Sequence, residues 1–175
     1  MTRTEPALSA FRYLITDMDG VLWRGRDPLP GLVEFFQFLR RHGIRFVCAT
    51  NNASALPGKL AERLQGWGAD VQPEEIVTSS IATADYLADT LPAGARLYVV
   101  GMEGLRVPLL QKGFEIAEEH VSAVVAGIDW QLTYEHLKRA VLNIRAGAKF
   151  IGTNGDRTFP SSEGIIPGAG AILAA

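Results

Sequence analysis

Residues 12–20 read Arg-Tyr-Leu-Ile-Thr-Asp-Met-Asp-Gly, an apolar run that leads directly into two acids and a glycine. The run predicts a buried strand at 12–16, and the cluster after it predicts a turn. Open α/β sheets bind ligands outside the carboxyl ends of their strands, so Asp17 and Asp19 are candidate functional residues. Asp and Gly are also ordinary turn residues, so this cluster is equally explained as a turn without a function. An EF-hand is excluded because its glycine belongs at the sixth loop position, whereas Gly20 is the fourth residue of this cluster.

Strands and helices alternate along the rest of the chain. This order predicts an α/β fold whose parallel strands are joined by right-handed crossovers. The last predicted helix is expected to bury a stripe formed by Tyr134, Leu137, Val141 and Ile144. The other strands are expected at residues 44–49, 96–100, 122–126 and 149–152, and the other helices at 31–42, from the Thr50–Ser54 cluster to about 64, at 80–90 and at 103–111.

The second predicted strand ends in Thr50-Asn51-Asn52, which combines a hydroxyl group with residues that favour a helix start. The free N–H groups of a helix start suit an anion such as phosphate. Carboxylates repel phosphate, and Mg²⁺ resolves this because it binds one or two carboxylates together with phosphate oxygens. In such a site one of Asp17 and Asp19 acts as the nucleophile, and the other as general acid and base.

Two of these segments together resemble a known family. Residues 14–22 (Leu-Ile-Thr-Asp-Met-Asp-Gly-Val-Leu), with Thr50-Asn51-Asn52, resemble the first two motifs of the haloacid dehalogenase superfamily of phosphatases. Further segments resemble subfamily IIA, which carries a large α/β cap after the second motif and is typified by para-nitrophenyl phosphatases. These segments are residues 78–84, 98–101, 152–156 and 167–171.

The resemblance implies a division of the chain near residue 78. Residues 1–77 would form the N-terminal half of a partial Rossmann-like parallel-sheet core, residues 78–156 an inserted α/β cap domain, and residues 157–175 a return segment to the core. Only two convincing core strands are predicted before residue 78, whereas a parallel sheet usually has about four to six strands. The small number of strands therefore predicts that residues 1–77 form only part of a core.

The resemblance also implies roles for single residues. Asp17 would be the nucleophile and a Mg²⁺ ligand, and Asp19 would be the general acid and base as well as a metal ligand through its backbone carbonyl. Thr50 would bind the transferring phosphoryl group through its hydroxyl, assisted by the backbone of Asn51.

Asn154 and Asp156 lie where the chain would leave the cap, so a substrate-facing role and an ordinary loop role are both open for them. The family uses two further elements, a phosphate-binding lysine and an acidic pair that completes the metal site. By the family's order both would follow Ala175, where the chain stops in what reads as the opening of a helix. We therefore expect the 175 residues alone to be inactive or nearly so.

These implications favour a Mg²⁺-dependent phosphomonoester hydrolase that works through an aspartyl-phosphate intermediate. The expected substrate is a small phosphorylated metabolite, such as a sugar phosphate, a nucleotide monophosphate or phosphoglycolate. The alternatives are a noncatalytic binding module that retains the fold and a phosphoryl-transfer mutase.

The composition limits the classes of partner that this chain is expected to bind. Seventeen basic against nineteen acidic residues leave a net charge of −2 without a charged run, which predicts no nucleic acid and no membrane surface as partner. No apolar window approaches the roughly 18 to 20 residues of a membrane span. The single cysteine, Cys48, is expected to be a buried, inert side chain and agrees with a cytoplasmic location. By analogy with the family, a homo-oligomer formed through the cap is expected.

Overall fold

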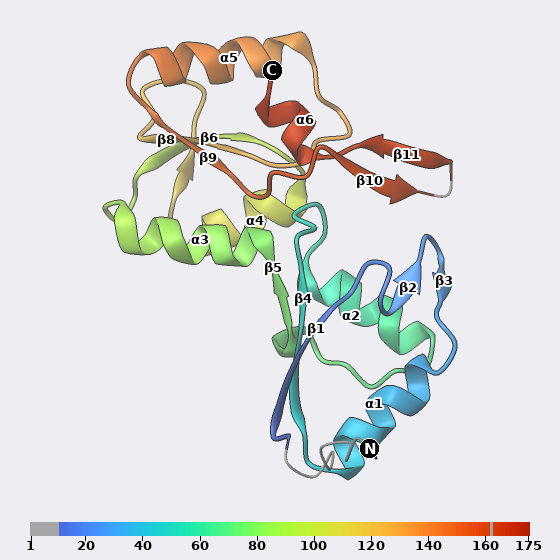
Figure 1. Cartoon of the computed structure of the whole chain (residues 1–175). Coiled ribbons are helices and arrows are strands. Elements are labelled where there is room, and N and C mark those ends of the chain that lie inside the picture. The colour runs from blue at the N-terminus through green and yellow to red at the C-terminus, as the bar shows by residue number, and fades with distance from the viewer. Residues whose placement is uncertain (1–10, 162) are drawn as a thin grey trace, which may run out of the picture. The chain divides into compact units, whose positions relative to one another are not determined.

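The structure, a computed structural model, describes residues 11–161 and 163–175 (Figure 1). The chain folds as two compact units. Unit 1 comprises Met1–Ala49 and Gly58–Val77, and unit 2 comprises Thr50–Pro57 and Thr78–Ala175. The expected α/β fold is confirmed, since both units contain sheets and helices. The division into residues 1–77, 78–156 and 157–175 stays a prediction.

The sheet of unit 1 has the strand order β1-β4-β5. Its strands are β1 (Tyr13–Asp17), β4 (Arg45–Thr50) and β5 (Ile76–Thr78). β1 and β4 run parallel, from Tyr13 opposite Arg45 to Asp17 opposite Ala49. Sequence reasoning counted two strands here and missed β5, because three residues are too few to show a period.

Two helices connect these strands, α1 (Leu32–Arg41) and α2 (Pro57–Gly66). α1 buries Leu32, Phe36 and Leu39, and the Phe36 ring lies 5.0 Å from the ring of Phe46 on β4. Successive right-handed crossovers in one direction place both helices on one face of the sheet (Figure 1).

The other face of this sheet is exposed, which corrects the expectation of a buried first strand. Tyr13 and Ile15 on β1 are 69% and 76% exposed, and Val77 on β5 is 39% exposed. Only Leu14 and Thr16 of the apolar run turn toward the helices. The sequence of β1 does not distinguish the buried face from the exposed one, because apolar side chains point to both faces of the sheet.

Unit 2 is built on a parallel sheet with the order β7-β6-β8-β9. Helices α3 and α4 cover one face and α5 covers the other (Figure 1). The strands are β6 (Arg96–Val100), β7 (Glu115–Ile116), β8 (Ala123–Ala126) and β9 (Lys149–Gly152), and the helices are α3 (Ser79–Thr90), α4 (Glu103–Gln111) and α5 (Tyr134–Arg145). The strands and helices expected in this part of the chain are therefore confirmed to within a residue.

Alternation along β6 divides the core of unit 2 into two clusters. Leu97 and Val99 pack with the residues of α3 and α4, whereas Tyr98 and Val100 pack with Ala140 of α5. Because both faces are covered, β6 and β8 are apolar at nearly every position, as is typical of a central parallel strand.

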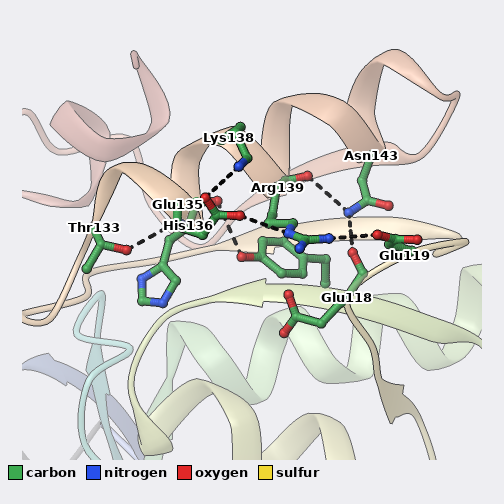
Figure 2. A network of polar contacts seen from close by, with 9 residues as sticks. Glu118, Glu119, Thr133, Glu135, His136, Lys138, Arg139 and Asn143 are labelled. Atoms are coloured by element: carbon green, nitrogen blue, oxygen red, sulfur yellow. Dashed lines mark hydrogen bonds and ion pairs between the residues drawn. The ribbon is translucent and has the colours of Figure 1, made fainter.

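The buried face of α5 differs from the predicted stripe. Leu137 and Ile144 of that stripe are half-buried, and Ile144 packs against the core. Tyr134 and Val141, in contrast, are 80% and 42% exposed, and the buried residues of the helix are Ala140 and Asn143. The Asn143 amide donates to the backbone carbonyls of Glu118 and Arg139 at 2.8 and 3.0 Å, as Figure 2 shows. A polar residue with its hydrogen bonds made is buried at little cost, so an apolar stripe alone mispredicts the rotation of this helix.

Arg139 of α5 forms one ion pair within the helix and one with the segment that precedes β8. The Arg139 guanidinium donates to Glu119 at 2.7 Å and to Glu135 at 3.1 Å (Figure 2).

The remaining elements are the short hairpin β2 (Trp23–Arg24) and β3 (Asp27–Pro28), a 3₁₀ turn at Pro73–Glu75, the hairpin β10 (Thr158–Ser161) and β11 (Gly164–Pro167), and α6 (Ala169–Leu173). None of the helices in the described part of the chain has the length and apolar character needed to span a membrane.

Candidate active site

The acid turn, residues 17–20, begins at the carboxyl end of β1, where the sequence predicts it. Asp17 is the last residue of the strand and is exposed, and its Oδ1 accepts a hydrogen bond from the backbone N–H of Met18 at 2.8 Å. Asp19 is also exposed, while Met18 between them is fully buried. The alternation therefore turns both carboxylates outward and anchors the turn from within.

Backbone hydrogen bonds close this turn tightly. The N–H of Leu22 donates to the carbonyl of Met18 at 2.8 Å, and the N–H of Gly20 donates to the carbonyl of Trp23 at 2.7 Å. Gly20 has a φ of 81°, a left-handed conformation that glycine adopts without strain. Leu22 and Trp23 are buried, so the two acids are carried by a loop with its own apolar anchors.

The indole of Trp23 holds Asp19. Its Nε1 donates to Asp19 Oδ1 at 2.9 Å. The Arg63 guanidinium lies 4.6 Å from the Trp23 ring centroid and 4.8 Å from that of Trp67. Burial lowers the pKa of Arg63, and the negative charge of Asp19 acts in the opposite direction.

The segment after β4 corrects the expected helix start. Thr50 ends the strand and is buried, but α2 begins only at Pro57. Thr50 Oγ1 accepts from the N–H of Asn52 at 3.1 Å, and Asn52 Oδ1 accepts from the N–H of Ser54 at 2.8 Å. These side chains bond the nearby backbone and so favour a turn over a helix, and a proline then opens α2. An anion at Thr50 would therefore meet a loop and not a helix start.

Three residues converge on Asn51 within unit 2. Its backbone carbonyl accepts from Ser79 Oγ at 2.7 Å and from Asn154 Nδ2 at 2.9 Å. Its side-chain amide donates to the carboxylate of Asp156, and the N–H of Asp156 donates to Asn154 Oδ1 at 3.0 Å. The structure thus brings together three of the sequence-predicted residues, Asn51, Asn154 and Asp156, and adds Ser79.

Glycines allow two close approaches around this cluster. A Cβ on Gly104 of α4 would lie 2.4 to 2.7 Å from backbone atoms of residues 53–55. A Cβ on Gly168 would lie 2.3 Å from the carbonyl oxygen of Asp156. Gly104 and Gly168 are therefore explained by close packing of main chain against main chain, and not by a nucleotide-binding motif.

The acid turn suits a hard cation by the chemistry of its donors. Asp17 and Asp19 supply carboxylate oxygens, and Mg²⁺ commonly takes one or two carboxylates and completes its shell with water and phosphate oxygens. Within residues 11–161 and 163–175, no group of three or more His, Cys, Asp or Glu side chains forms a metal site.

Sequence reasoning missed Trp23, Arg63 and Ser79. Trp23 stands six residues after Asp17, and a tryptophan so close to paired acids is the one local signal that pointed to it. The charge of Asp19 acts on Arg63 across 44 residues, and Ser79 bonds Asn51 across 28 residues, so no local pattern indicates either contact.

The family model for haloacid dehalogenase-like hydrolases matches residues 14–115, more than half of the chain. The chain belongs to this family. Its relatives place it in subfamily IIA, as the sequence motifs predicted.

The relatives are similar over nearly the whole of this chain. An acid sugar phosphatase of Staphylococcus aureus is 40% identical over 166 residues, which are 94% of this chain and 64% of that protein. A p-nitrophenyl phosphatase from Archaeoglobus fulgidus is 32% identical, with a TM-score of 0.87 over 94% of this chain and 63% of its own. A glycerol phosphate phosphatase from Mycobacterium tuberculosis is 33% identical in its calcium complex, with a TM-score of 0.87 over 95% of this chain and 49% of its own. The chain thus spans 64% of the length of this curated relative.

Proposed function

We propose that this chain carries the nucleophile and the general acid and base of a Mg²⁺-dependent phosphomonoester hydrolase. The observation that supports this most is the acid turn, in which two exposed carboxylates stand at the end of a parallel strand on a buried, hydrogen-bonded loop. The names of the three relatives described above, each a phosphatase, support the reaction class.

The first step forms an aspartyl-phosphate on Asp17. A carboxylate oxygen of Asp17 attacks phosphorus, the bond from phosphorus to the ester oxygen breaks, and Asp19 gives its proton to the departing oxygen. The products of this step are an alcohol and the phosphorylated Asp17.

The second step returns the enzyme to its starting state. Asp19, now a carboxylate, takes a proton from water as the water oxygen attacks phosphorus. The bond between phosphorus and Asp17 breaks, phosphate leaves, and Asp19 is protonated again. Mg²⁺, held by Asp17 and by the backbone carbonyl of Asp19, would screen the charge of the phosphate.

Four further residues are proposed to bind the phosphate or the substrate. Thr50 would bind the phosphoryl group through its hydroxyl, with the backbone of Asn51 beside it. Asn154 and Asp156 would act through Asn51, because both are hydrogen-bonded to it.

The proposed substrate is a small phosphorylated metabolite, and among the classes considered a sugar or polyol phosphate has the most support. That support comes from the relatives named for sugar phosphate and glycerol phosphate. Nucleotide monophosphates and phosphoglycolate belong in the same screen. The metal is proposed as Mg²⁺ because the glycerol phosphate phosphatase has also been crystallised with magnesium.

Two alternatives are set against this proposal. A noncatalytic module that retains the fold would bind phosphorylated ligands without turnover. A mutase would return the phosphoryl group to a second position of the substrate. The paired acids favour a catalytic chain over the noncatalytic module. Transfer of the phosphoryl group to water, with release of free phosphate, would distinguish a hydrolase from a mutase.

We further propose that the protein works in the cytoplasm as a homo-oligomer formed through the cap, with neither nucleic acid nor membrane as a partner. A single, buried cysteine without a disulfide supports the location.

The experiment is a screen of phosphorylated metabolites, with and without Mg²⁺, on the longest product of the gene that contains this chain. We expect phosphate release in the presence of Mg²⁺, and an Asp17→Asn variant should fall to background because an amide is a poor nucleophile. A Glu34→Gln variant, changed at an acid on the exposed side of α1, serves as the matched control. A flat screen would count against catalysis, and turnover by Asp17→Asn would remove Asp17 from the nucleophile's role.

A further inference from the structure

We propose that Trp23 is a positioning residue, whose buried indole N–H holds the Asp19 carboxylate in the orientation from which it protonates the leaving oxygen. The inference rests on the proposed function, because it concerns the acid of that mechanism. Trp23, Asp19 and the residues that support them all belong to unit 1.

The bond itself is well placed for this role. Trp23 Nε1 lies 2.9 Å from Asp19 Oδ1, and the tryptophan is only 2% exposed. A buried indole has one hydrogen to donate and needs an acceptor, and a carboxylate makes the stronger kind of acceptor. A donor on Oδ1 disfavours a proton on that atom, so the proton that Asp19 delivers is directed to Oδ2.

The indole is in turn fixed by its neighbours. The Arg63 guanidinium packs over the Trp23 ring, 4.6 Å from its centroid, and also donates a hydrogen bond to the carbonyl of Gly25. The Trp67 ring lies 5.8 Å from the Trp23 ring at an angle of 55°. A ring with a cation over its face and a second aromatic ring tilted against it keeps its N–H direction.

The backbone joins the same two residues a second time. Asp19 and Trp23 form an isolated β-bridge, and the N–H of Gly20 between them donates to the carbonyl of Trp23 at 2.7 Å. Main chain and side chain therefore both tie the acid to the tryptophan. Such a double connection is what a carboxylate needs to be held in one orientation before substrate binds.

The chemical consequence depends on the leaving group. When a sugar or polyol phosphate reacts, its sugar or polyol part would leave as an alkoxide, so it needs the proton from Asp19 as the bond from phosphorus to oxygen breaks. A p-nitrophenolate is stable without a proton, so its departure requires little help from a general acid. Loss of the positioning bond should therefore slow alkyl esters far more than p-nitrophenyl phosphate.

The test uses the longest product of the gene and compares glycerol phosphate with p-nitrophenyl phosphate. The measured quantity is kcat/KM, which reports the steps up to formation of the aspartyl-phosphate. For Trp23→Phe we expect a loss of about 10- to 100-fold on glycerol phosphate, a part of the roughly 10²- to 10⁴-fold that general acids contribute. On p-nitrophenyl phosphate the same variant should lose less than about 3-fold, because that ester makes little use of the acid.

Two controls separate positioning from packing. Trp67→Phe makes the same substitution and keeps an aromatic ring under Arg63, while Trp23 remains the donor to Asp19, so it should affect both esters alike and weakly. If Trp23→Phe folds poorly, benzothienylalanine at position 23 keeps the shape of the ring and removes only the N–H. This replacement should reproduce the selective loss on glycerol phosphate.

The outcomes are distinguishable. Equal losses on the two esters, or no loss on either, in the Trp23→Phe or benzothienylalanine protein would overturn the positioning role and leave the proposed function intact. A parent protein that hydrolyses neither ester would overturn the proposed function and the positioning role with it.

Discussion

Cys48 shows how burial alone sets the chemistry of a side chain. It lies on β4 with no exposed surface, and desolvation raises the pKa of its thiol to about 12, helped by the negative charge of Glu75. The thiolate is the reactive form of cysteine, so the thiol in the folded chain is inert, as the sequence predicted.

We expect the native chain to resist thiol reagents at pH 8. Labelling with 5,5′-dithiobis(2-nitrobenzoate) should be slower than that of a free thiol by at least about 10²-fold, because the raised pKa leaves little thiolate. The same chain in guanidinium chloride, where Cys48 is exposed, is the control. Labelling of the native chain at the denatured rate would contradict the burial of this residue.

The same pKa predicts a loss of stability in alkali. In the unfolded chain the thiol ionises near its ordinary value of 9.0, whereas in the folded chain it keeps its proton up to about pH 12. Between these values the folded state binds more protons, so its stability falls as pH rises. This thiol alone should lower the free energy of unfolding by roughly 1.4 kcal/mol per pH unit in that window. Denaturant unfolding at pH 9 and at pH 10.5 measures the slope, and Cys48→Ala should flatten it.

At the scale of elements, one glycine decides how closely helix α4 approaches the 50–57 segment. Gly104 lies in α4, and its Cα faces backbone atoms of residues 53–55. Helix propensity favours alanine over glycine, but a Cβ there would lie 2.4 Å from the carbonyl carbon of Ser54. Main-chain atoms in a packed loop do not move aside easily, so packing outweighs propensity at this position.

We expect Gly104→Ala to destabilise the chain by about 1–3 kcal/mol, in the range of overpacked sites. The matched control is Gly58→Ala in α2, where a Cβ meets nothing within 4 Å. That change should be neutral or stabilise by up to about 1 kcal/mol. Thermal and urea unfolding of the two variants measure the difference, and equal stabilities would show that the close approach carries no cost.

For the whole molecule, the exposed sheet face of unit 1 is the feature with the widest consequence. Tyr13 and Ile15 on β1 and Val77 on β5 are exposed apolar side chains, and the half-buried Val47 on β4 lies opposite Ile15. Parallel sheets are normally covered on both faces, and a contiguous exposed apolar surface promotes association.

We expect Ile15→Thr to reduce binding of the dye 8-anilinonaphthalene-1-sulfonate and self-association of the 175-residue chain. Stability should change by no more than about 0.5 kcal/mol, because the side chain is exposed. Ile165→Thr on β11, where the isoleucine is 78% exposed, is the control and should have a smaller effect on both readouts. Dye fluorescence and sedimentation measure the outcome, and equal effects of the two variants would rule out a special role for the sheet face.

Much of the fold could be read from local patterns. The limits of α4 and β6 match the prediction, because apolar runs bounded by glycines are strong local signals. β5 and the buried face of α5 could not be read in this way. The first is too short to show a period, and the second depends on Asn143, whose bonding partner Glu118 lies 25 residues away.

The sequence by itself determined where the acids stand, because an apolar strand and the polar turn that ends it are consecutive in the chain. Only the tertiary structure decided what holds those acids and the segment beside them. The indole of Trp23 reaches Asp19 because the loop closes on itself, and Asn154 and Asp156 reach Asn51 across 103 and 105 residues. Contacts of this kind depend on how the packed core brings distant segments together, and no local pattern of residue types encodes that distance.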